Sequence, residues 1–242
     1  MPRTGTRKLI EYIRKDLIES NIKMGRDALF DLLRSYGLLV RKTKRFHITT
    51  DSKHFFHKSP NLLKNLDLKH AEQVFVSDIT YIRIDGGHSY LALVTDAYSK
   101  KIMGWKLDNN MKVQLVKEAL EMAHKNRIHD HKTVIHHSDR GIQYCCPDFS
   151  EFAQDKGFVL STTQQYDPYE NAVAERINGI LKYEFGLKKT IKNIEIAQKM
   201  VAQAVQIYNN ERIHWSLDLK TPEHVHNQYD KQPYKSYSKK AA

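Results

Sequence analysis

Three acidic side chains stand in sequence contexts that suit metal-dependent chemistry. Asp78 lies inside the apolar run VFVSDITYIRI, Asp139 follows the short apolar pair Val134-Ile135, and Glu175 lies within a helical pattern. Asp139 comes 61 positions after Asp78, and 35 residues separate it from Glu175. Carboxylates are hard oxygen ligands that leave coordination sites open for phosphate and nucleophile, as two-metal phosphoryl transfer requires. We therefore expect the three side chains to meet and share divalent cations.

The three acids differ in how strongly the sequence supports this role. A carboxylate inside an apolar strand is costly to bury without a cation or several hydrogen-bond donors, so Asp78 points to a functional site. Taken alone, Glu175 could be a solvated helix acid, and Asp139 in SDRG could be a turn or capping residue. The spacing of all three together is what favours a shared site.

The helix that carries Glu175 has a polar face and an apolar face. Asn171, Glu175, Asn178 and Lys182 recur at steps of four, three and four residues, which places them on one side. The other side carries Val173, Ile177, Ile180 and Leu181. Such a helix is expected to pack its apolar face on a sheet, so that the glutamate can reach metal and Lys182 can reach substrate phosphate.

The periodicity of the chain predicts an α/β fold with strands early and helices interleaved later. Strands are expected at 74–84, 89–98, 100–107, 133–138 and 157–162, the third of them at a sheet edge. Helices are expected at 6–20, 25–36, 111–125, 147–156, around Glu175, and at 192–211. This order resembles the ribonuclease-H-like fold, a mixed five-stranded sheet flanked by helices. In that fold the first and fourth strands lie side by side, so Asp78 and Asp139 would be neighbours.

The charge is concentrated at the front of the chain. The formal net charge is +11, and residues 1–70 carry 16 Lys and Arg against 7 Asp and Glu, whereas residues 71–228 carry 19 against 20. A basic field of this kind attracts nucleic acid. The expected organisation is a helix-turn-helix-like DNA-binding region at 1–40, a basic linker at 41–70, a core at 71–227 and a basic tail at 228–242. DNA contacts are expected from four linker residues, Arg41, Lys42, Lys44 and Arg45.

Several motifs agree with one known family. The motifs are SDITYI, TDAYS, HHSDRGIQY, ENAVAERINGILK and the late YNNERIHWSL followed by TPEHV. With the acid spacing, the chain resembles a DDE transposase of the retroviral-integrase superfamily, and more narrowly the second-reading-frame product of the insertion-sequence family numbered three. It departs from that pattern at Phe75, Glu170 and Ile213, where Trp, Asp and Pro are usual.

The resemblance implies a function, a cofactor and partners. Asp78, Asp139 and Glu175 would be the catalytic metal ligands, binding Mg²⁺ or Mn²⁺ as two ions for DNA strand cleavage and strand transfer. Lys182 would contact the end DNA, and further DNA contacts are expected from Asn171, Asn178 and Arg140. Expected partners are double-stranded DNA, further copies of the chain in a homo-oligomer, and an upstream-frame helix-turn-helix protein or fusion, with no membrane.

Other functions remain open at this point. One is a ribonuclease-H-like nuclease that cuts without joining, and another is a DNA-binding regulator of transposition. A tyrosine recombinase would need an Arg and His cluster, of which Arg212-Ile213-His214 is only a fragment. A zinc site built from His136, His137, Cys145 and Cys146 lacks the usual ligand spacing. The two adjacent cysteines favour a reducing compartment, and we expect a cytoplasmic, nucleoid-associated protein.

Overall fold

The fold is built around a long β-hairpin. The computed structural model describes residues 3–40, 55–56, 58–129, 133–164 and 171–228. Strand β1 (Val74–Ile84) pairs antiparallel with β2 (Gly87–Asp96) along their whole lengths. Gly86 closes the turn with a positive φ of 83°, a conformation that glycine adopts without strain.

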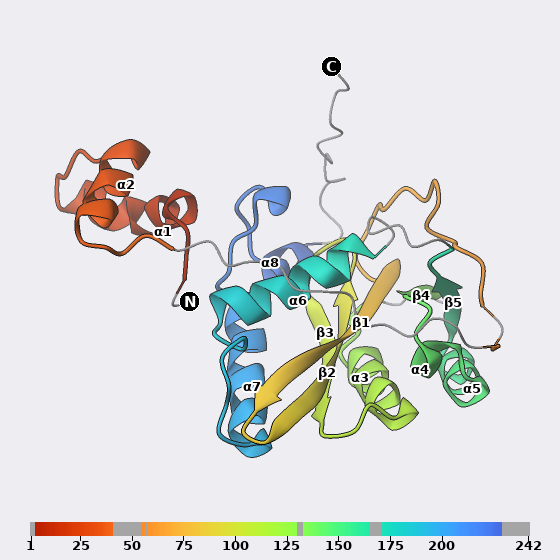
Figure 1. Cartoon of the computed structure of the whole chain (residues 1–242). Helices are drawn as coiled ribbons and strands as arrows, with labels where there is room; N and C mark the ends of the chain where they lie inside the picture. Colours follow the sequence, from red (N-terminus) through yellow and green to blue (C-terminus); the bar gives the residue numbers. More distant parts are fainter. Residues whose placement is uncertain (1–2, 41–54, 57, 130–132, 165–170, 229–242) are drawn as a thin grey trace.

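The hairpin lies in the middle of a five-stranded mixed sheet with the order β3-β2-β1-β4-β5 (Figure 1). Strand β3 (Ile102–Asp108) is antiparallel to β2 and forms one edge, as predicted. Strands β4 (Val134–Ser138) and β5 (Phe158–Thr162) follow in parallel on the other side. Ser77 of β1 lies opposite Ser138 of β4, so the residues that follow them, Asp78 and Asp139, leave the same level of the sheet.

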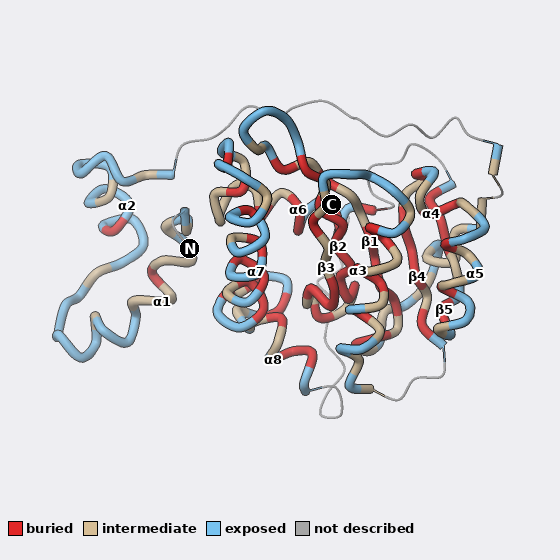
Figure 2. The backbone as a smooth tube through the Cα atoms, turned by 90° about the horizontal axis from the view of Figure 1, so that it is seen from below, coloured by how far each residue is buried: buried red, intermediate tan, exposed pale blue. Residues whose placement is uncertain are grey.

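Helices cover both faces of the sheet. Leu91 and Leu93 of β2 point to one face and pack with α6 (Ala172–Glu184) and α7 (Ile194–Asn210). The alternate residues Ala92 and Val94 point to the other face and pack with α3 (Val113–Lys125) and α5 (Pro147–Asp155). Figure 2 shows the buried residues concentrated in the strands and in the inner sides of these helices. The predicted ribonuclease-H-like arrangement is confirmed.

Three short elements were not expected from the sequence. They are α4 (Ile142–Cys145), the 3₁₀ helix η1 (Trp215–Leu217) and α8 (Pro222–Asn227). Each is too short to show a periodic pattern of apolar residues. Among the described residues, no helix is both long and apolar enough to cross a membrane.

The N-terminal helices α1 (Thr6–Glu19) and α2 (Arg26–Ser35) form the predicted pair. Ile10 and Leu29 are buried, whereas Ile18 and Tyr36 are each 73% exposed. The pair attaches to the C-terminal part of the chain through Tyr12. Its hydroxyl donates to the Glu211 carbonyl at 3.0 Å and accepts from the Ile213 amide at 3.0 Å.

Some predictions fall on parts of the chain outside the described residues. These are the four linker DNA contacts Arg41, Lys42, Lys44 and Arg45, the family departure Glu170, and the tail from residue 229 onward. The domain boundaries remain predictions.

Candidate active site

Strand β1 carries Asp78 to the point where it faces helix α6. The side chain is half-buried, and Asn178 of α6 donates from Nδ2 to its Oδ2 at 2.7 Å. Burial, followed by the charges of Asp139 and then Glu175, raises the pKa of Asp78 to about 7, although the Asn178 hydrogen bond opposes this. A carboxyl group that is destabilised by two neighbouring carboxylates is one that a divalent cation would stabilise as the anion.

Asp139 follows β4 directly and is held by its own loop. Its Oδ1 accepts the Gly141 amide at 3.0 Å, and a Cβ on Gly141 would stand only 3.0 Å from that oxygen. A larger residue at position 141 would therefore press on the carboxylate. This accounts for the glycine in SDRG through close approach rather than through backbone conformation.

Glu175 lies in the first turn of α6, with an exposed side chain. Partial burial and the charge of Asp139 raise its pKa above the ordinary value. Glu175 and Asp139 thus interact, and both act on Asp78. The prediction that a strand, a loop and a helix bring these acids together agrees with this electrostatic coupling.

The three carboxylates do not form a tight cluster. Their oxygens do not all lie within 4.8 Å of one another. The donor set, all carboxylate oxygen, is the one that Mg²⁺ and Mn²⁺ prefer.

The two asparagines of α6 hold the helix on the sheet. Asn171 donates from Nδ2 to the Ser77 carbonyl at 3.1 Å, and Asn178 donates to Asp78 as described above. Both side chains are buried, at 6% and 5% exposure. The helix face that was expected to be polar is therefore only partly exposed, because these two short amides bind the Ser77 carbonyl and the Asp78 carboxylate of β1. The two positions offer little surface for the DNA contact predicted there.

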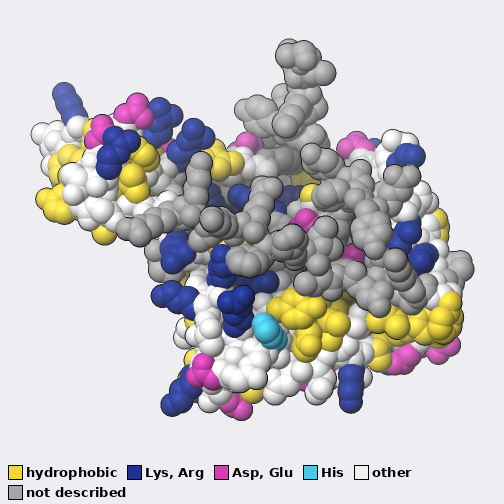
Figure 3. Space-filling view, viewed as in Figure 1, with side chains coloured by type: hydrophobic (Ala, Val, Ile, Leu, Met, Phe, Trp, Pro, Cys, Tyr) yellow, Lys and Arg dark blue, Asp and Glu magenta, His cyan; other side chains and the backbone are white. Residues whose placement is uncertain are grey.

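Lys182 lies farther along α6 and belongs to a basic group. Burial lowers its pKa first, the charge of Asp78 opposes this, and Arg83 and Lys188 lower it further. In Figure 3, Lys and Arg side chains gather over the C-terminal end of α6. Arg140, next to Asp139, is half-buried and donates from Nε to the Thr163 carbonyl.

Tyr144 is a site residue that the sequence reading did not single out. It lies in α4, five positions after Asp139, and is 4% exposed. Burial first, and then the charges of Asp78 and Asp139, raise the pKa of its phenol well above the ordinary value. Its hydroxyl has no hydrogen-bond partner among the described residues. The signal in the sequence was its place in HHSDRGIQY, one helical turn beyond the aspartate.

The side-chain contacts of His136, His137, Cys145 and Cys146 do not support the zinc site considered from the sequence. His136 shares a hydrogen bond with Ser77 and His137 with Ser161, each at 2.8 Å. These contacts use the two histidines separately, and Cys145 and Cys146 are both free thiols. The four residues do not form a group of metal ligands.

Arg212 serves the fold rather than a recombinase site. Its side chain is 2% exposed and binds Glu184 through two nitrogens, each at 2.7 Å. Its Nη1 also lies 2.8 Å from Nε2 of His214. The Arg212-Ile213-His214 fragment is too small to indicate a tyrosine recombinase, and in the structure the Arg212 side chain is engaged in this ion pair.

Comparison with known proteins identifies the family. Two models described as Integrase core domain match residues 69–168 and 156–222. An insertion element IS600 31 kDa protein of Shigella sonnei is 32% identical over 93% of this chain and 82% of its own length. Transposase InsF for insertion sequence IS3A of Escherichia coli (strain K12) is 31% identical over 93% of this chain and 77% of its own length.

A solved structure supports the same fold. The HTLV-2 integrase catalytic core domain in complex with magnesium is 16% identical, with a TM-score of 0.51 over 65% of this chain and 97% of that one. The fold, the integrase-core matches and the insertion-element relatives lead to one conclusion. The chain belongs to the DDE transposases of the integrase superfamily that insertion sequences encode, and it is a polynucleotidyl transferase of that type.

Proposed function

We propose that Asp78, Asp139 and Glu175 bind two divalent ions, Mg²⁺ or Mn²⁺, with which this transposase cuts and joins DNA strands. The observation that carries the proposal is the placement of Asp78 and Asp139 at the same level of neighbouring strands, with Glu175 on the helix that Asn178 ties to Asp78. The pKa of Asp78, which burial and the charges of the other two acids raise to about 7, agrees with this placement. When bound, the ions supply charge neutralisation and activation of water or a DNA 3′-hydroxyl for in-line attack on a phosphodiester.

The side chains around the acids have distinct tasks in this proposal. Asn178 orients the Asp78 carboxylate through its 2.7 Å hydrogen bond and favours the anion. Gly141 leaves room for Asp139 while its amide fixes one carboxylate oxygen. The buried Tyr144 hydroxyl lies close enough to Asp78 and Asp139 for their charges to raise its pKa. It is proposed to donate to a phosphate oxygen or a water molecule between the two aspartates.

DNA follows the basic surface beside the acids. Arg83 and Lys188 act electrostatically on Lys182, so the three cations form one group. Figure 3 shows Lys and Arg side chains gathered over the C-terminal end of α6. Such a group neutralises phosphates and gives binding that weakens with salt. Lys182 is proposed to contact the element end, and Arg140 the strand nearest Asp139. Arg41, Lys42, Lys44 and Arg45 are proposed to extend this contact from the linker.

Two further partners follow from a reaction on paired DNA ends. Joining two ends of one element in one complex needs at least two copies of the active site, so we propose a homo-oligomer. An upstream-frame helix-turn-helix protein or fusion is proposed to assist end recognition. A DNA substrate would place the protein at the nucleoid.

Incubation of the protein with labelled element-end DNA and Mn²⁺ tests the function. Joined products support the transposase, cut-only products support a nuclease, and retarded but intact DNA supports a regulator. Asp78→Asn, Asp139→Asn and Glu175→Gln are each expected to abolish cleavage and leave DNA binding largely unchanged. Asp85→Asn, in the exposed hairpin turn, is the matched control and should cleave normally. Metal-dependent cleavage that survives one of the three changes would remove that residue from the site.

A further inference from the structure

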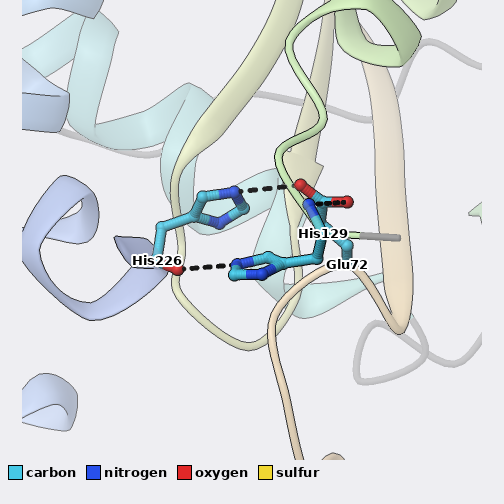
Figure 4. Close-up of side chains that lie close together, drawn as sticks. All are labelled: Glu72, His129 and His226. Atoms are coloured by element: carbon cyan, nitrogen blue, oxygen red, sulfur yellow. Dashed lines mark hydrogen bonds and ion pairs between the residues drawn. The ribbon is translucent and has the colours of Figure 1, made fainter. Parts of the chain in front are cut away.

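A second group of possible metal ligands lies away from the three acids. Glu72 precedes β1, His129 follows α3, and His226 lies in α8 (Figure 4). Each offers one ligand atom, and these atoms all lie within 4.8 Å of one another. Glu72 and His226 are fully buried, and His129 is half-buried. We propose that the three side chains bind a structural Zn²⁺ ion, with two imidazoles and one carboxylate as ligands.

The distance between two of the ligand atoms fits a tetrahedral zinc site. Nε2 of His226 lies 3.3 Å from Oε1 of Glu72. Two atoms that each bind zinc at about 2.0–2.1 Å, at a tetrahedral angle, stand about 3.3 Å apart. A charge-assisted hydrogen bond between an imidazolium and a carboxylate is usually shorter, about 2.7–2.9 Å. The observed separation thus leaves room for both atoms to bind one ion.

The two ring nitrogens of His226 face different partners. Ser99 donates its hydroxyl hydrogen to Asp96 at 2.7 Å, and the same oxygen lies 3.0 Å from Nδ1 of His226. Because that hydroxyl hydrogen is already used, Nδ1 of His226 donates to Ser99. This contact orients the ring so that its other nitrogen, Nε2, is directed at the Glu72 carboxylate.

The surroundings of the cluster resemble the outer contacts that orient metal ligands. Arg127 donates from Nε to Oε2 of Glu72 at 3.2 Å, so the other oxygen, Oε1, is directed at His226. The Ile128 amide also donates to Oε1, at 2.8 Å. Nε2 of His129 lies 2.9 Å from the His226 carbonyl, which holds the two histidines side by side. These contacts therefore orient the side chains of Glu72, His129 and His226 before an ion binds.

The bound ion would join three segments that are distant in sequence. Glu72 stands ahead of β1, six residues before Asp78, which corresponds to about 20 Å along an extended strand. The zinc site is consequently separate from the acids, and its role is to fasten α8 and the chain after α3 to the base of the central strand. It supplies stability and takes no part in the proposed DNA chemistry.

Zinc binding by the full chain tests the proposal. The protein is prepared with Asp139→Asn and Glu175→Gln, so that metal at the acidic site does not contribute to the count. After gel filtration with Zn²⁺, elemental analysis should find one zinc ion per chain. Co²⁺ in place of Zn²⁺ should give the visible absorption of a tetrahedral site. Zinc should also raise the midpoint of thermal unfolding.

Variants of the ligands distinguish a specific site from adventitious binding. His226→Gln and His129→Gln should each weaken zinc binding by at least about tenfold, the scale on which lost site contacts act. His224→Gln, on the exposed side of the same helix, should bind zinc as the parent does. If His226→Gln does not fold, the half-buried His129→Gln carries the test alone. The proposal fails if the parent retains no zinc or if His129→Gln and His224→Gln bind equally. The first outcome would indicate a metal-free imidazolium–carboxylate pair, and the second would indicate adventitious zinc binding.

Discussion

The Asn178 amide donates to the Asp78 carboxylate across 2.7 Å, and this hydrogen bond ties the middle of helix α6 to the central strand β1. Glu175 lies three residues earlier on the same helix, so a contact that fixes Asn178 also sets the distance between Glu175 and Asp78. The hydrogen bond lowers the pKa of Asp78, against the effect of burial and of the neighbouring acids.

Asn178→Ala should move the acidic limb of the cleavage profile to higher pH. The amide stabilises the carboxylate, so its loss raises the pKa of Asp78 further above about 7. A hydrogen bond worth about 0.5–1.5 kcal/mol corresponds to about 0.5–1 pH unit. Cleavage rates measured with Mg²⁺ from pH 6 to pH 9 would show the shift.

Asn171→Ala is the control for this change. It removes a buried amide of the same helix that binds the Ser77 carbonyl and no carboxylate. We expect lower stability, by about 1–3 kcal/mol, with an unshifted pH profile. Equal profiles for Asn178→Ala and Asn171→Ala would contradict the role given to Asn178.

Gly104→Ala should destabilise the protein severely, because β3 and α3 touch at this residue. An added Cβ would stand 2.1 Å from the Ala119 carbonyl oxygen and 2.6 Å from the Ala123 amide nitrogen. The backbones would have to separate, and overpacking of this kind costs about 1–3 kcal/mol or more. Urea unfolding measures the loss.

Gly179→Ala should instead stabilise the protein in the same urea unfolding experiment. Gly179 lies inside α6, and an added Cβ there meets no atom within 4 Å. Alanine in a helix interior is favoured over glycine by about 0.5–1 kcal/mol. Stabilisation by both substitutions would show that β3 and α3 are not in contact at Gly104.

His136 should make the fold sensitive to acid. Burial, with a smaller effect of His137, lowers the pKa of His136 from its ordinary value of 6.5 to about 3. Between these values the unfolded chain binds a proton that the folded chain excludes, so this residue costs stability as the pH falls from 6.5 toward 3. The slope is about 1.4 kcal/mol per pH unit.

The slope is measured from urea unfolding between pH 4.5 and 6.5. His136→Gln should flatten it relative to the parent, whatever its own stability. His88→Gln, on an exposed residue of β2, should leave it unchanged. An unaltered slope in His136→Gln would show that another group dominates the acid response.

Tyr12→Phe should loosen the attachment of α1. The change removes the hydroxyl that binds both the Glu211 carbonyl and the Ile213 amide. A loss of about 1–2 kcal/mol is expected, with faster hydrogen exchange in α1 and unchanged exchange in α7. Tyr36→Phe, at a residue 73% exposed, is the matched control.

The core of the fold could be predicted because its signals are local. Strand β1 has the bounds of the run VFVSDITYIRI, whose residues are apolar on both faces, as in a strand covered on both sides. The edge position of β3 was also predicted. The helix of Glu175 was found from its periodicity, and the structure begins it at Ala172.

What the sequence could not provide was the identity of contact partners. The pattern of α6 placed Asn171 and Asn178 on a polar face, but periodicity does not say whether solvent or a strand covers that face. Ile18 and Tyr36 fit an amphipathic pattern and are nevertheless exposed. Tyr144 and the cluster of Glu72, His129 and His226 depend on residues brought together by the fold, with no fixed spacing in the chain.

The hydrogen bonds of Tyr12 reach partners 199 and 201 positions away. During synthesis, helix α1 therefore emerges long before the residues that it contacts. Its hydrogen bonds can form only after residues 211–213 have been made. Contacts between such remote segments form late and slow the search for the native state. A product that ended before residue 211 would keep all five strands, yet Tyr12 of α1 would lack both of these hydrogen-bond partners.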